Sequence, residues 1–361
     1  MAPKKKKLPI PLLLLIILLC VTVVLCAAAA GVWYYGRHAL TSNVTAPQLP
    51  ASPAETVSEP EETPSREPES PVVLDSYTIE HNGKYYRYND SMINLLLLGI
   101  DADDKPSQPL DPGSNIQCDV ILLAAMDVRN NQLTLLSLNR DTICNLEVIN
   151  PDGSSQGYYP AQLALSFCYG DGLAKSCELT KNTVSDLLYG LQIHGYGAFY
   201  MGGISILNDA LGGVTVNIRD DYDFTRRFWQ MIPGQDVTLT GEMAYAYIRS
   251  RQEDEAGNVN RMARQKQYML AMLSQAMQQV KSNPASVFSL YDAVDDYILT
   301  DLDISRIAYL ATEAASMGFD GEIRTLSGDL TVDDTDHMRL TLDQEALYET
   351  MLQVFYEEVT D

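Results

Sequence analysis

Positive charge is scarce in this sequence of 361 residues. It holds 25 lysines and arginines against 48 aspartates and glutamates, which gives a formal net charge of −23. Four of the positive residues stand together as Lys4–Lys7, and no acidic residue precedes Glu55. Long-range repulsion from so acidic a body excludes nucleic acid or an anionic membrane surface as a broad partner, but it leaves room for an anionic ligand in a local basic pocket.

Histidine is scarce as well, and this argues against a hydrolase of the Ser-His-Asp type. The four histidines lie in no motif: His38, His81, His194 and His337. One Gly-x-Ser-x-Gly match exists at 153–157, but it lies in a polar loop and no apolar strand leads into it, so the strained turn that such a serine needs is missing. No cysteine spacing resembles a structural zinc site.

Charge is absent from residues 8–35, of which Leu12–Val32 is almost wholly apolar. About 20 such residues cross a bilayer as a helix, and the aromatic residues 33–35 suit the interface. The lysines before the span favour a cytoplasmic tip at 1–7, one transmembrane anchor at 8–35 and an extracytoplasmic remainder. The alternative is a cleaved signal peptide, because Ala27–Ala30 offers small residues at a plausible cleavage point. The apolar stretch is long for a signal, so we favour the anchor.

The segment after the anchor has little to bury. Residues 46–71 are rich in proline, glutamate and serine, a composition that stays extended. We therefore predict an extracytoplasmic linker at 36–71 and a single globular domain at 72–361, with no internal repeat.

The domain alternates strand and helix patterns. Continuous apolar runs predict buried strands at 93–100, 119–125 and 132–139, after a hairpin at 77–88 that turns at Asn82-Gly83. Helical spacing is expected at 159–169, 180–189, 202–209, 241–247, 260–282, 284–292, 304–315 and 343–357, with further short strands at 214–218, 323–326 and 339–342. This order predicts a layered α/β domain with a central mixed sheet, preceded by one transmembrane helix.

Four cysteines follow the predicted anchor, where disulfides persist, and they allow three pairings. A strand hairpin that turns at Asn130-Asn131 would bring Cys118 opposite a residue near Ile143. We therefore predict the disulfides Cys118–Cys144 and Cys168–Cys177; the alternative is four free thiols.

Polar residues follow the apolar strands where each of them ends. Asp101 ends the first run, Asp119 opens the second, and Arg140-Asp141 follow the third. The hairpin register places Asp119 nearly opposite Arg140, at a sheet edge of the kind where ligands bind in α/β folds. The alternative is a structural salt bridge between Asp119 and Arg140.

A second group of arginines suits an anion. Arg249 and Arg251 share a side if the backbone there is extended, and Arg261 and Gln265 share a face of a helix near its N-terminus. Arginine forks and a helix N-terminus both bind phosphate, and phosphate with aspartate suits Mg²⁺. The alternative is that these arginines pair with the acidic loop 252–260.

The order of these motifs resembles the LytR-CpsA-Psr family of cell-envelope phosphotransferases. The segments that carry the resemblance lie between about 93 and 277: NLLLLGID (94–101), CDVILLAAMD (118–127), LTLLSLNRDT (133–142), LNDALGGVTVNI (207–218), LTGEMAYAYIRSR (239–251) and NRMARQ (260–265).

The resemblance implies a three-layer α/β/α head with an apolar pocket for a polyprenyl tail. It further implies transfer of a glycosyl phosphate, from a teichoic-acid-like or capsule-like polymer on polyprenyl pyrophosphate, to peptidoglycan outside the membrane of a bacterial cell. Matched by position, Asp101 and Asp119 correspond to the acidic residues associated with Mg²⁺, and Asp119 and Arg140 are our catalytic candidates. Residues that correspond to the pyrophosphate-binding set are Arg140, Arg249, Arg251, Arg261 and Gln265.

Two positions depart from the family pattern. Gln117 occupies a position that usually holds arginine, and Asn258 one that usually holds aspartate, so reduced activity is one expectation. Two other functions therefore remain open at this point: a non-catalytic membrane-anchored module that binds polyprenyl lipid or wall glycan, and a pyrophosphatase that passes the phosphoryl group to water.

Overall fold

The computed structural model describes residues 30–42, 44–50, 77–252, 255–334 and 337–359. Its strands are β1 (Thr78–His81), β2 (Lys84–Tyr88), β3 (Met92–Ile100), β4 (Cys118–Asp127), β5 (Gln132–Leu138), β6 (Ile143–Ile149), β7 (Ser155–Gln162), β8 (Gly195–Tyr200), β9 (Val214–Asn217), β10 (Asp236–Leu239), β11 (Ile298–Thr300), β12 (Gly318–Thr325), β13 (Gly328–Val332), β14 (Met338–Leu342) and β15 (Tyr356–Glu358). Its helices are α2 (Ala174–Leu187), α3 (Gly203–Ala210), α4 (Gly241–Arg249), α5 (Glu255–Ser282), α6 (Ser286–Val294), α7 (Ile304–Ser316) and α8 (Gln344–Phe355), with 3-10 turns η1 (Leu163–Ser166) and η2 (Asp295–Tyr297).

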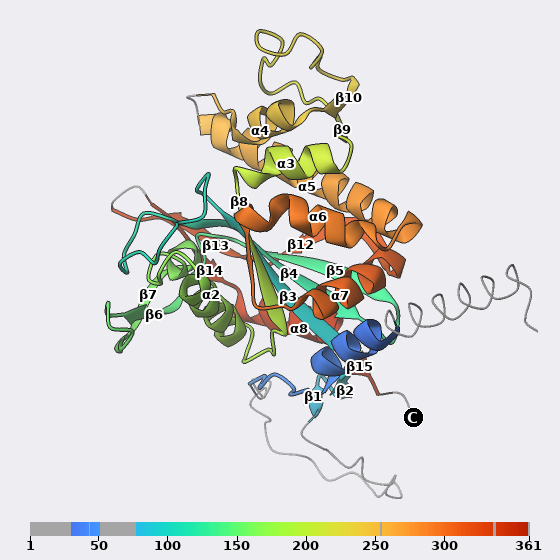
Figure 1. Cartoon of the computed structure of the whole chain (residues 1–361). Helices are drawn as coiled ribbons and strands as arrows, with labels where there is room; N and C mark the ends of the chain where they lie inside the picture. The colour runs from blue at the N-terminus through green and yellow to red at the C-terminus, as the bar shows by residue number, and fades with distance from the viewer. Residues whose placement is uncertain (1–29, 43, 51–76, 253–254, 335–336, 360–361) are drawn as a thin grey trace, which may run out of the picture.

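A six-stranded mixed sheet organises the domain, in the order β11-β8-β3-β4-β5-β12 (Figure 1). β3 pairs with β8 in parallel and with β4 antiparallel, and β5 pairs antiparallel with β4 and parallel with β12. The prediction of an α/β fold with a central mixed sheet is confirmed. The β4–β5 register places Ile121 opposite Leu138, two residues away from the predicted register, and a shift of two keeps each side chain on its predicted face.

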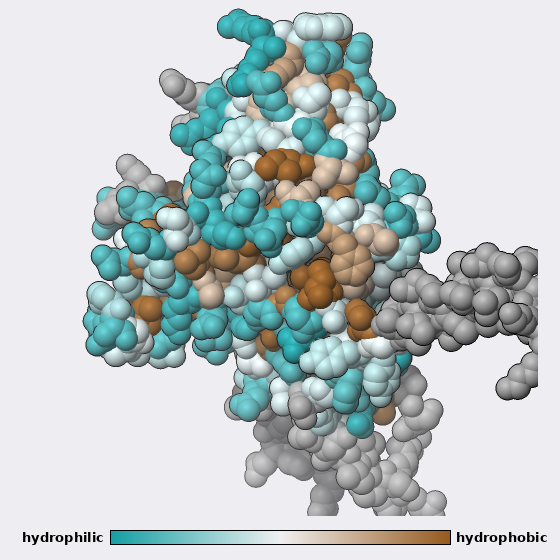
Figure 2. Space-filling model, in the orientation of Figure 1, coloured by the Kyte–Doolittle hydropathy of each residue, from teal (hydrophilic) through white to brown (hydrophobic). Residues whose placement is uncertain are grey.

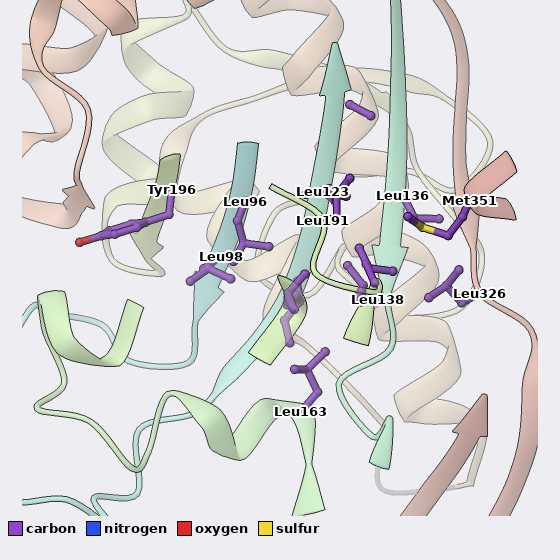
Figure 3. Packing of buried hydrophobic residues seen from close by; sticks show 14 of the residues in the cluster. Leu96, Leu98, Leu123, Leu136, Leu138, Leu163, Leu191, Tyr196, Leu326 and Met351 are labelled. Carbon is purple, nitrogen blue, oxygen red and sulfur yellow. The ribbon is translucent and has the colours of Figure 1, made fainter. Parts of the chain in front are cut away.

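Helices cover both faces of this sheet. On one face, Leu96, Leu98 and Leu123 pack with residues of α2 and α8 in the largest buried cluster, part of which Figure 3 shows. On the other face, Ile93 and Leu95 pack with residues of α5 and α7. This alternation along β3 follows from the two-residue period of a strand, and it explains why the run 92–100 is apolar almost throughout.

A second buried cluster lies beyond the end of the sheet, in a lobe built from α3, α4, β9, β10 and part of α5 (Figure 1). Phe224, Tyr247 and Tyr268 contribute large side chains to it. α5 joins the two parts, because its residues contact both this lobe and the sheet. The lobe matters for function because its helix α4 ends next to the edge of the sheet.

One predicted helix is wrong. Residues 159–169 include the end of β7 and the short turn η1. β7 pairs with β6 in a two-stranded ribbon outside the main sheet. Pro160 lies within β7, where it lacks the N–H that a helix interior needs. Tyr158 and Tyr159 are both exposed on this two-stranded ribbon.

The chain before the domain is partly described. Most of the predicted anchor 8–35 lies outside the described residues, and among those described no helix has both the length and the apolar character to span a bilayer. Residues 30–41 are helical, and they contact α7: the rings of Trp33 and Tyr309 lie 5.4 Å apart, and Leu40 is 2% exposed.

The predicted linker 36–71 differs from expectation at its start. Residues 44–50 pack on the domain, where the Thr45 N–H donates to Gln192 Oε1 at 2.8 Å and the Gln48 N–H donates to the Tyr189 carbonyl at 2.7 Å. Val44, Ala46 and Leu49 supply the apolar contacts, and these residues precede most of the glutamates of the segment. Residues 51–71 lie outside the described part.

The predicted disulfides are absent, since Cys118, Cys144, Cys168 and Cys177 are all free thiols. The prediction failed because the chain after β5 leaves the sheet, so that β6 pairs with β7 and carries Cys144 away from β4. Burial raises the pKa of Cys168 to about 11 and of Cys144 to about 12, so both thiols stay protonated at neutral pH.

Candidate functional site

A β-bulge sets the first functional carboxylate. Gly99 pairs with Val120 and Ile100 with Cys118, so Asp119 is the extra residue of β4. Bulges re-aim side chains and are common beside active sites. The carboxylate of Asp119 accepts a hydrogen bond from Arg140 Nη1 across the sheet edge. The predicted meeting of Asp119 and Arg140 is therefore confirmed, and the salt bridge weighed as its alternative is present as well.

Arg140 is held on three sides. Besides Asp119, its Nη2 donates to Gln117 Oε1 at 2.5 Å, and its Nε lies 3.7 Å from Asp141 Oδ1. Burial raises the pKa of Asp119; Arg140 opposes that shift, Asp101 adds to it, and Arg261 also lowers it. The charges of Asp101 and Arg261 thus act on the same carboxylate that Arg140 contacts.

Arg249 reaches the same region from α4. Its Nη1 lies 2.7 Å from Asp103 Oδ1 and 2.7 Å from the Tyr245 hydroxyl, which itself donates to Asp103 Oδ1 at 2.5 Å. Partial burial lowers the pKa of Arg249, but Tyr245 and Asp103 offset this and leave the pKa raised. Asp101 acts on Arg249 in the same direction, which ties this group to the carboxylates near Asp119.

The start of α5 is fixed by a buried arginine. Arg264 is fully buried; its Nη1 lies 2.6 Å from Asp221 Oδ1, and its Nε donates to the Tyr247 carbonyl at 2.8 Å. A further N–H donates to the carbonyl of Ser250, the C-cap of α4. Gln265 Nε2 donates to the Ile248 carbonyl at 3.1 Å. Arg264 and Gln265 thus join α5 to the end of α4 and set where Arg249 and Arg261 lie.

Two predicted details of the arginine group differ in the structure. Arg249 is the last residue of helix α4, so the extended backbone that would have aligned it with Arg251 is wrong at that position. Helix α4 continues through Arg249 and ends at its C-cap, Ser250, so the backbone of Arg249 is helical. Arg251 is exposed beyond this cap, next to residues 253–254 that lie outside the described part. Of the predicted pyrophosphate set, Arg140 contacts Asp119 and Arg249 contacts Asp103, whereas Gln265 contacts backbone. The charge of Arg261 lowers the pKa of Asp119.

A cation would have few protein ligands here. Within the described residues no group of three or more histidine, cysteine, aspartate or glutamate side chains could hold a metal ion. Asp101 and Asp119 nevertheless lie near enough for the charge of Asp101 to raise the pKa of Asp119, a repulsion that a cation would relieve. Mg²⁺ commonly takes one or two carboxylates together with phosphate oxygens of the substrate. A shared site of this kind would draw on Asp101 and Asp119.

An apolar area of the sheet adjoins these residues, and we call it the exposed sheet face: Leu97, Gly99, Val120, Gly197 and Phe199. Leu97 lies in an interior strand, yet it is 39% exposed. Gly197, its neighbour on β8, has no side chain, so this strand leaves one side of Leu97 uncovered. Asp119 directly precedes Val120 on β4. Figure 2 shows further hydrophobic surface in the region of α3, α6 and α7. The exposed hydrophobic residues of these helices include Ile206, Phe288 and Ile304.

Sequence reasoning missed Asp103, Tyr245 and the role of Arg264. Asp103 follows two residues after Asp101, in a loop whose path no periodicity predicts. Tyr245 and Arg249 are four residues apart on α4, a spacing that places them on one helical face and was available as a signal.

Known proteins are similar to this chain over a range that includes the site residues described above. A model of the LytR_cpsA_psr family matches residues 54–351. The polyisoprenyl-teichoic acid–peptidoglycan teichoic acid transferase TagU of Oceanobacillus iheyensis is 28% identical over 250 residues, 67% of this chain and 71% of that protein. The protein of the same name from Enterococcus faecalis is 29% identical over 233 residues, 63% of this chain and 67% of that protein. The crystal structure of TagV from B. subtilis shares the fold, with a TM-score of 0.54, 21% identity, and coverage of 73% of this chain and 96% of that one.

Proposed function

Because the chain belongs to the LytR_cpsA_psr family, we propose that it transfers a glycosyl phosphate from a polyprenyl-pyrophosphate carrier to peptidoglycan. The observation that carries this proposal is the meeting of the arginine–carboxylate group with the exposed sheet face. One part suits a pyrophosphate and the other a long apolar chain, and a polyprenyl pyrophosphate has both. The relatives of this chain are named teichoic acid transferases, so a wall polymer is the best-supported group to be transferred.

The arginines are paired with carboxylates that a substrate can replace. Arg140 contacts Asp119, and Arg249 contacts Asp103, and these pairs are only partly buried. A pyrophosphate brings more negative oxygens than one carboxylate and suits the fork of an arginine side chain. When it binds, Arg140 and Arg249 would turn to its oxygens, and Asp119, released from Arg140, would be left together with Asp101 to face a cation.

Catalysis would then rest on charge and position. Transfer of a phosphoryl group spreads negative charge over its oxygens and over the leaving phosphate, so fixed guanidinium groups stabilise the transition state. Arg140, Arg249 and Arg261 would hold that charge. Asp119 lies where it could accept the proton of an acceptor hydroxyl or bind the cation, because its bulge aims it at the same edge. A bound Mg²⁺ would supply further neutralisation of the phosphate oxygens.

The proposal places the domain outside the cell membrane, where peptidoglycan lies. The predicted anchor 8–35 would tether it, with the lysines 4–7 on the cytoplasmic side. The contact between residues 30–41 and α7 would hold the domain close to the end of that anchor. A lipid carrier embedded in the same membrane then shares the surface on which the domain sits.

Removal of divalent cations should abolish transfer. Two carboxylates alone bind a cation weakly, so the metal is expected to bind together with the pyrophosphate and to be accessible to a chelator. Transfer by the full chain in detergent micelles should fall to background in EDTA and return when Mg²⁺ is added in excess. Undiminished transfer in EDTA would contradict the metal assignment and leave the arginine assignment intact.

Filling the exposed sheet face should weaken use of a long lipid donor. A Cβ added at Gly197 would lie 3.8 Å from Leu97 Cδ2, an ordinary contact, so the backbone tolerates a side chain there. Gly197→Leu should raise KM for a long-chain polyprenyl donor by about tenfold, the equivalent of about 1.4 kcal/mol, and leave KM for a short-chain donor unchanged. Gly197→Ala is the matched control. Equal effects on both donors would show that this face does not hold the lipid.

A further inference from the structure

A pocket separate from the arginine–carboxylate group lies on the opposite side of the sheet. It holds about 400 Å³. Its lining residues come from the β6–β7 ribbon, α2, the turn after α2 and the start of α8, elements that Figure 1 labels. They are Cys144, Asn145, Tyr158, Thr183, Asp186, Leu187, Tyr189 and Gln344. α2 and α8 cover the face of the sheet that carries Leu96 and Leu98, whereas Leu97 belongs to the other face.

The chemistry of this lining suits a saccharide. Asn145 and Gln344 offer side-chain amides, Asp186 a carboxylate, and Tyr158 and Tyr189 aromatic rings with hydroxyls. Tyr158 is 61% exposed, and its ring is available to stack against a flat apolar surface. No lysine or arginine lines the pocket, and Asp186 together with the acidic chain repels polyanions. A glycan without phosphate groups therefore fits better than a phosphate-rich polymer.

The pocket lies close to Arg140 along the chain. Cys144 lies four residues after Arg140, and because even a fully extended chain spans four residues in about 13 Å, the two Cα atoms are no farther apart than that. The link is fixed: the Ala164 N–H donates to the Arg140 carbonyl at 2.9 Å, and Gln162 Nε2 donates to Asp141 Oδ1 at 3.0 Å. A saccharide in the pocket can thus present a hydroxyl near Arg140.

The in-line geometry of phosphoryl transfer indicates which saccharide binds in the pocket. The attacking and leaving oxygens of a transferred phosphoryl group lie on opposite sides of phosphorus. The proposed lipid face, which receives the leaving polyprenyl phosphate, lies on the side of Leu97, so the attacking hydroxyl must come from the other side of the edge. We propose that the pocket lined by Tyr158 and Asp186 binds the acceptor glycan of peptidoglycan, an inference that rests on the proposed transfer function.

The proposed transfer forms one bond to phosphorus and breaks another. An acceptor hydroxyl oxygen forms a bond to the glycosyl-linked phosphorus, and the bond from that phosphorus to the bridging oxygen of the pyrophosphate breaks. The bridging oxygen leaves with the polyprenyl phosphate, and the hydroxyl proton goes to a base at the edge, for which Asp119 is placed.

Adjacent tyrosines on β7 provide a matched test. Tyr158 lines the pocket, whereas its neighbour Tyr159, 52% exposed, does not. The full chain in detergent micelles is titrated calorimetrically with a tetrasaccharide of alternating N-acetylglucosamine and N-acetylmuramic acid. Tyr158→Ala and Asp186→Ala should each weaken its binding about tenfold, the size of one good contact, and raise the acceptor KM. Tyr159→Ala should bind as the wild type, and all three variants should bind the lipid-linked donor normally.

The outcomes separate this proposal from the transfer function. Unchanged tetrasaccharide binding in both Tyr158→Ala and Asp186→Ala overturns it, as does a loss of donor binding in its place. Arg140→Ala should still bind the tetrasaccharide as the wild type does. A wild-type chain that binds the tetrasaccharide in this pocket but transfers nothing would refute the proposed function and leave the glycan site standing.

Discussion

Arg140→Ala is expected to lower transfer by about a hundredfold or more, which is the usual effect of removing one fixed charge or donor from a transition state. Its guanidinium contacts Asp119, the proposed catalytic carboxylate, and also lies beside Gln117 and Asp141. Without it, a pyrophosphate would lose a bidentate partner, and Asp119 would lose its counter-charge. Single-turnover transfer from a lipid-linked donor measures the effect on the chemical step.

Two variants make this result specific. Arg129 lies in the turn at the other end of the same β4–β5 hairpin, and it pairs at the surface with Asp90 and Glu357. Arg129→Ala should therefore leave transfer unchanged. Arg140→Lys keeps the charge but loses the fork, so only a small part of the activity should return. Full activity in a folded Arg140→Ala protein would sink the site assignment.

Arg264→Ala is expected to destabilise the fold by about 3 kcal/mol, because it removes the donor of one oxygen of the buried Asp221 carboxylate and of two backbone carbonyls. Its side chain is 1% exposed and that of Asp221 is 8% exposed. The guanidinium also lies over the rings of Tyr222 and Phe224 at 5.7 and 5.5 Å. The midpoint of thermal unfolding should fall by roughly 6 °C or more.

The control for stability is another arginine of the same lobe. Arg226 is 89% exposed and pairs only with Asp223 at the surface, so Arg226→Ala should shift the midpoint by no more than about 1 °C. Circular dichroism of the full chain in one detergent measures both variants. Equal midpoints for Arg264→Ala and Arg226→Ala would mean that Arg264 does not join α4 to α5.

The central sheet and half of the site were predictable because local pattern and topology agree there. The apolar runs of β3, β4 and β5 are long, and a hairpin between β4 and β5 needs few connecting residues. Asp119 and Arg140 therefore had to meet even though the predicted register was two residues off. The arginines on α4 and α5 came from motifs in the expected order, and the family match over residues 54–351 includes them.

What failed depended on contacts between segments far apart in the chain. The Cys118–Cys144 prediction assumed that β6 continues the sheet, whereas β6 finds its partner in β7. The packing of residues 44–50 on the domain depends on Gln192 and Tyr189, which lie more than 140 residues later in the chain. Asp103 faces Arg249 across 146 residues of sequence. No period of two or of 3.6 residues carries such information, because it resides in the packing of one element on another.

The most direct test of the account is reconstitution of the reaction. The full chain in detergent micelles is incubated with a polyprenyl-pyrophosphate-linked wall polymer, Mg²⁺ and peptidoglycan, and both the polymer on peptidoglycan and the released polyprenyl phosphate are measured. We predict that the two products appear together in equal amounts. Donor binding without either product, or polyprenyl phosphate released with free glycosyl phosphate in place of polymer-bearing peptidoglycan, would contradict it.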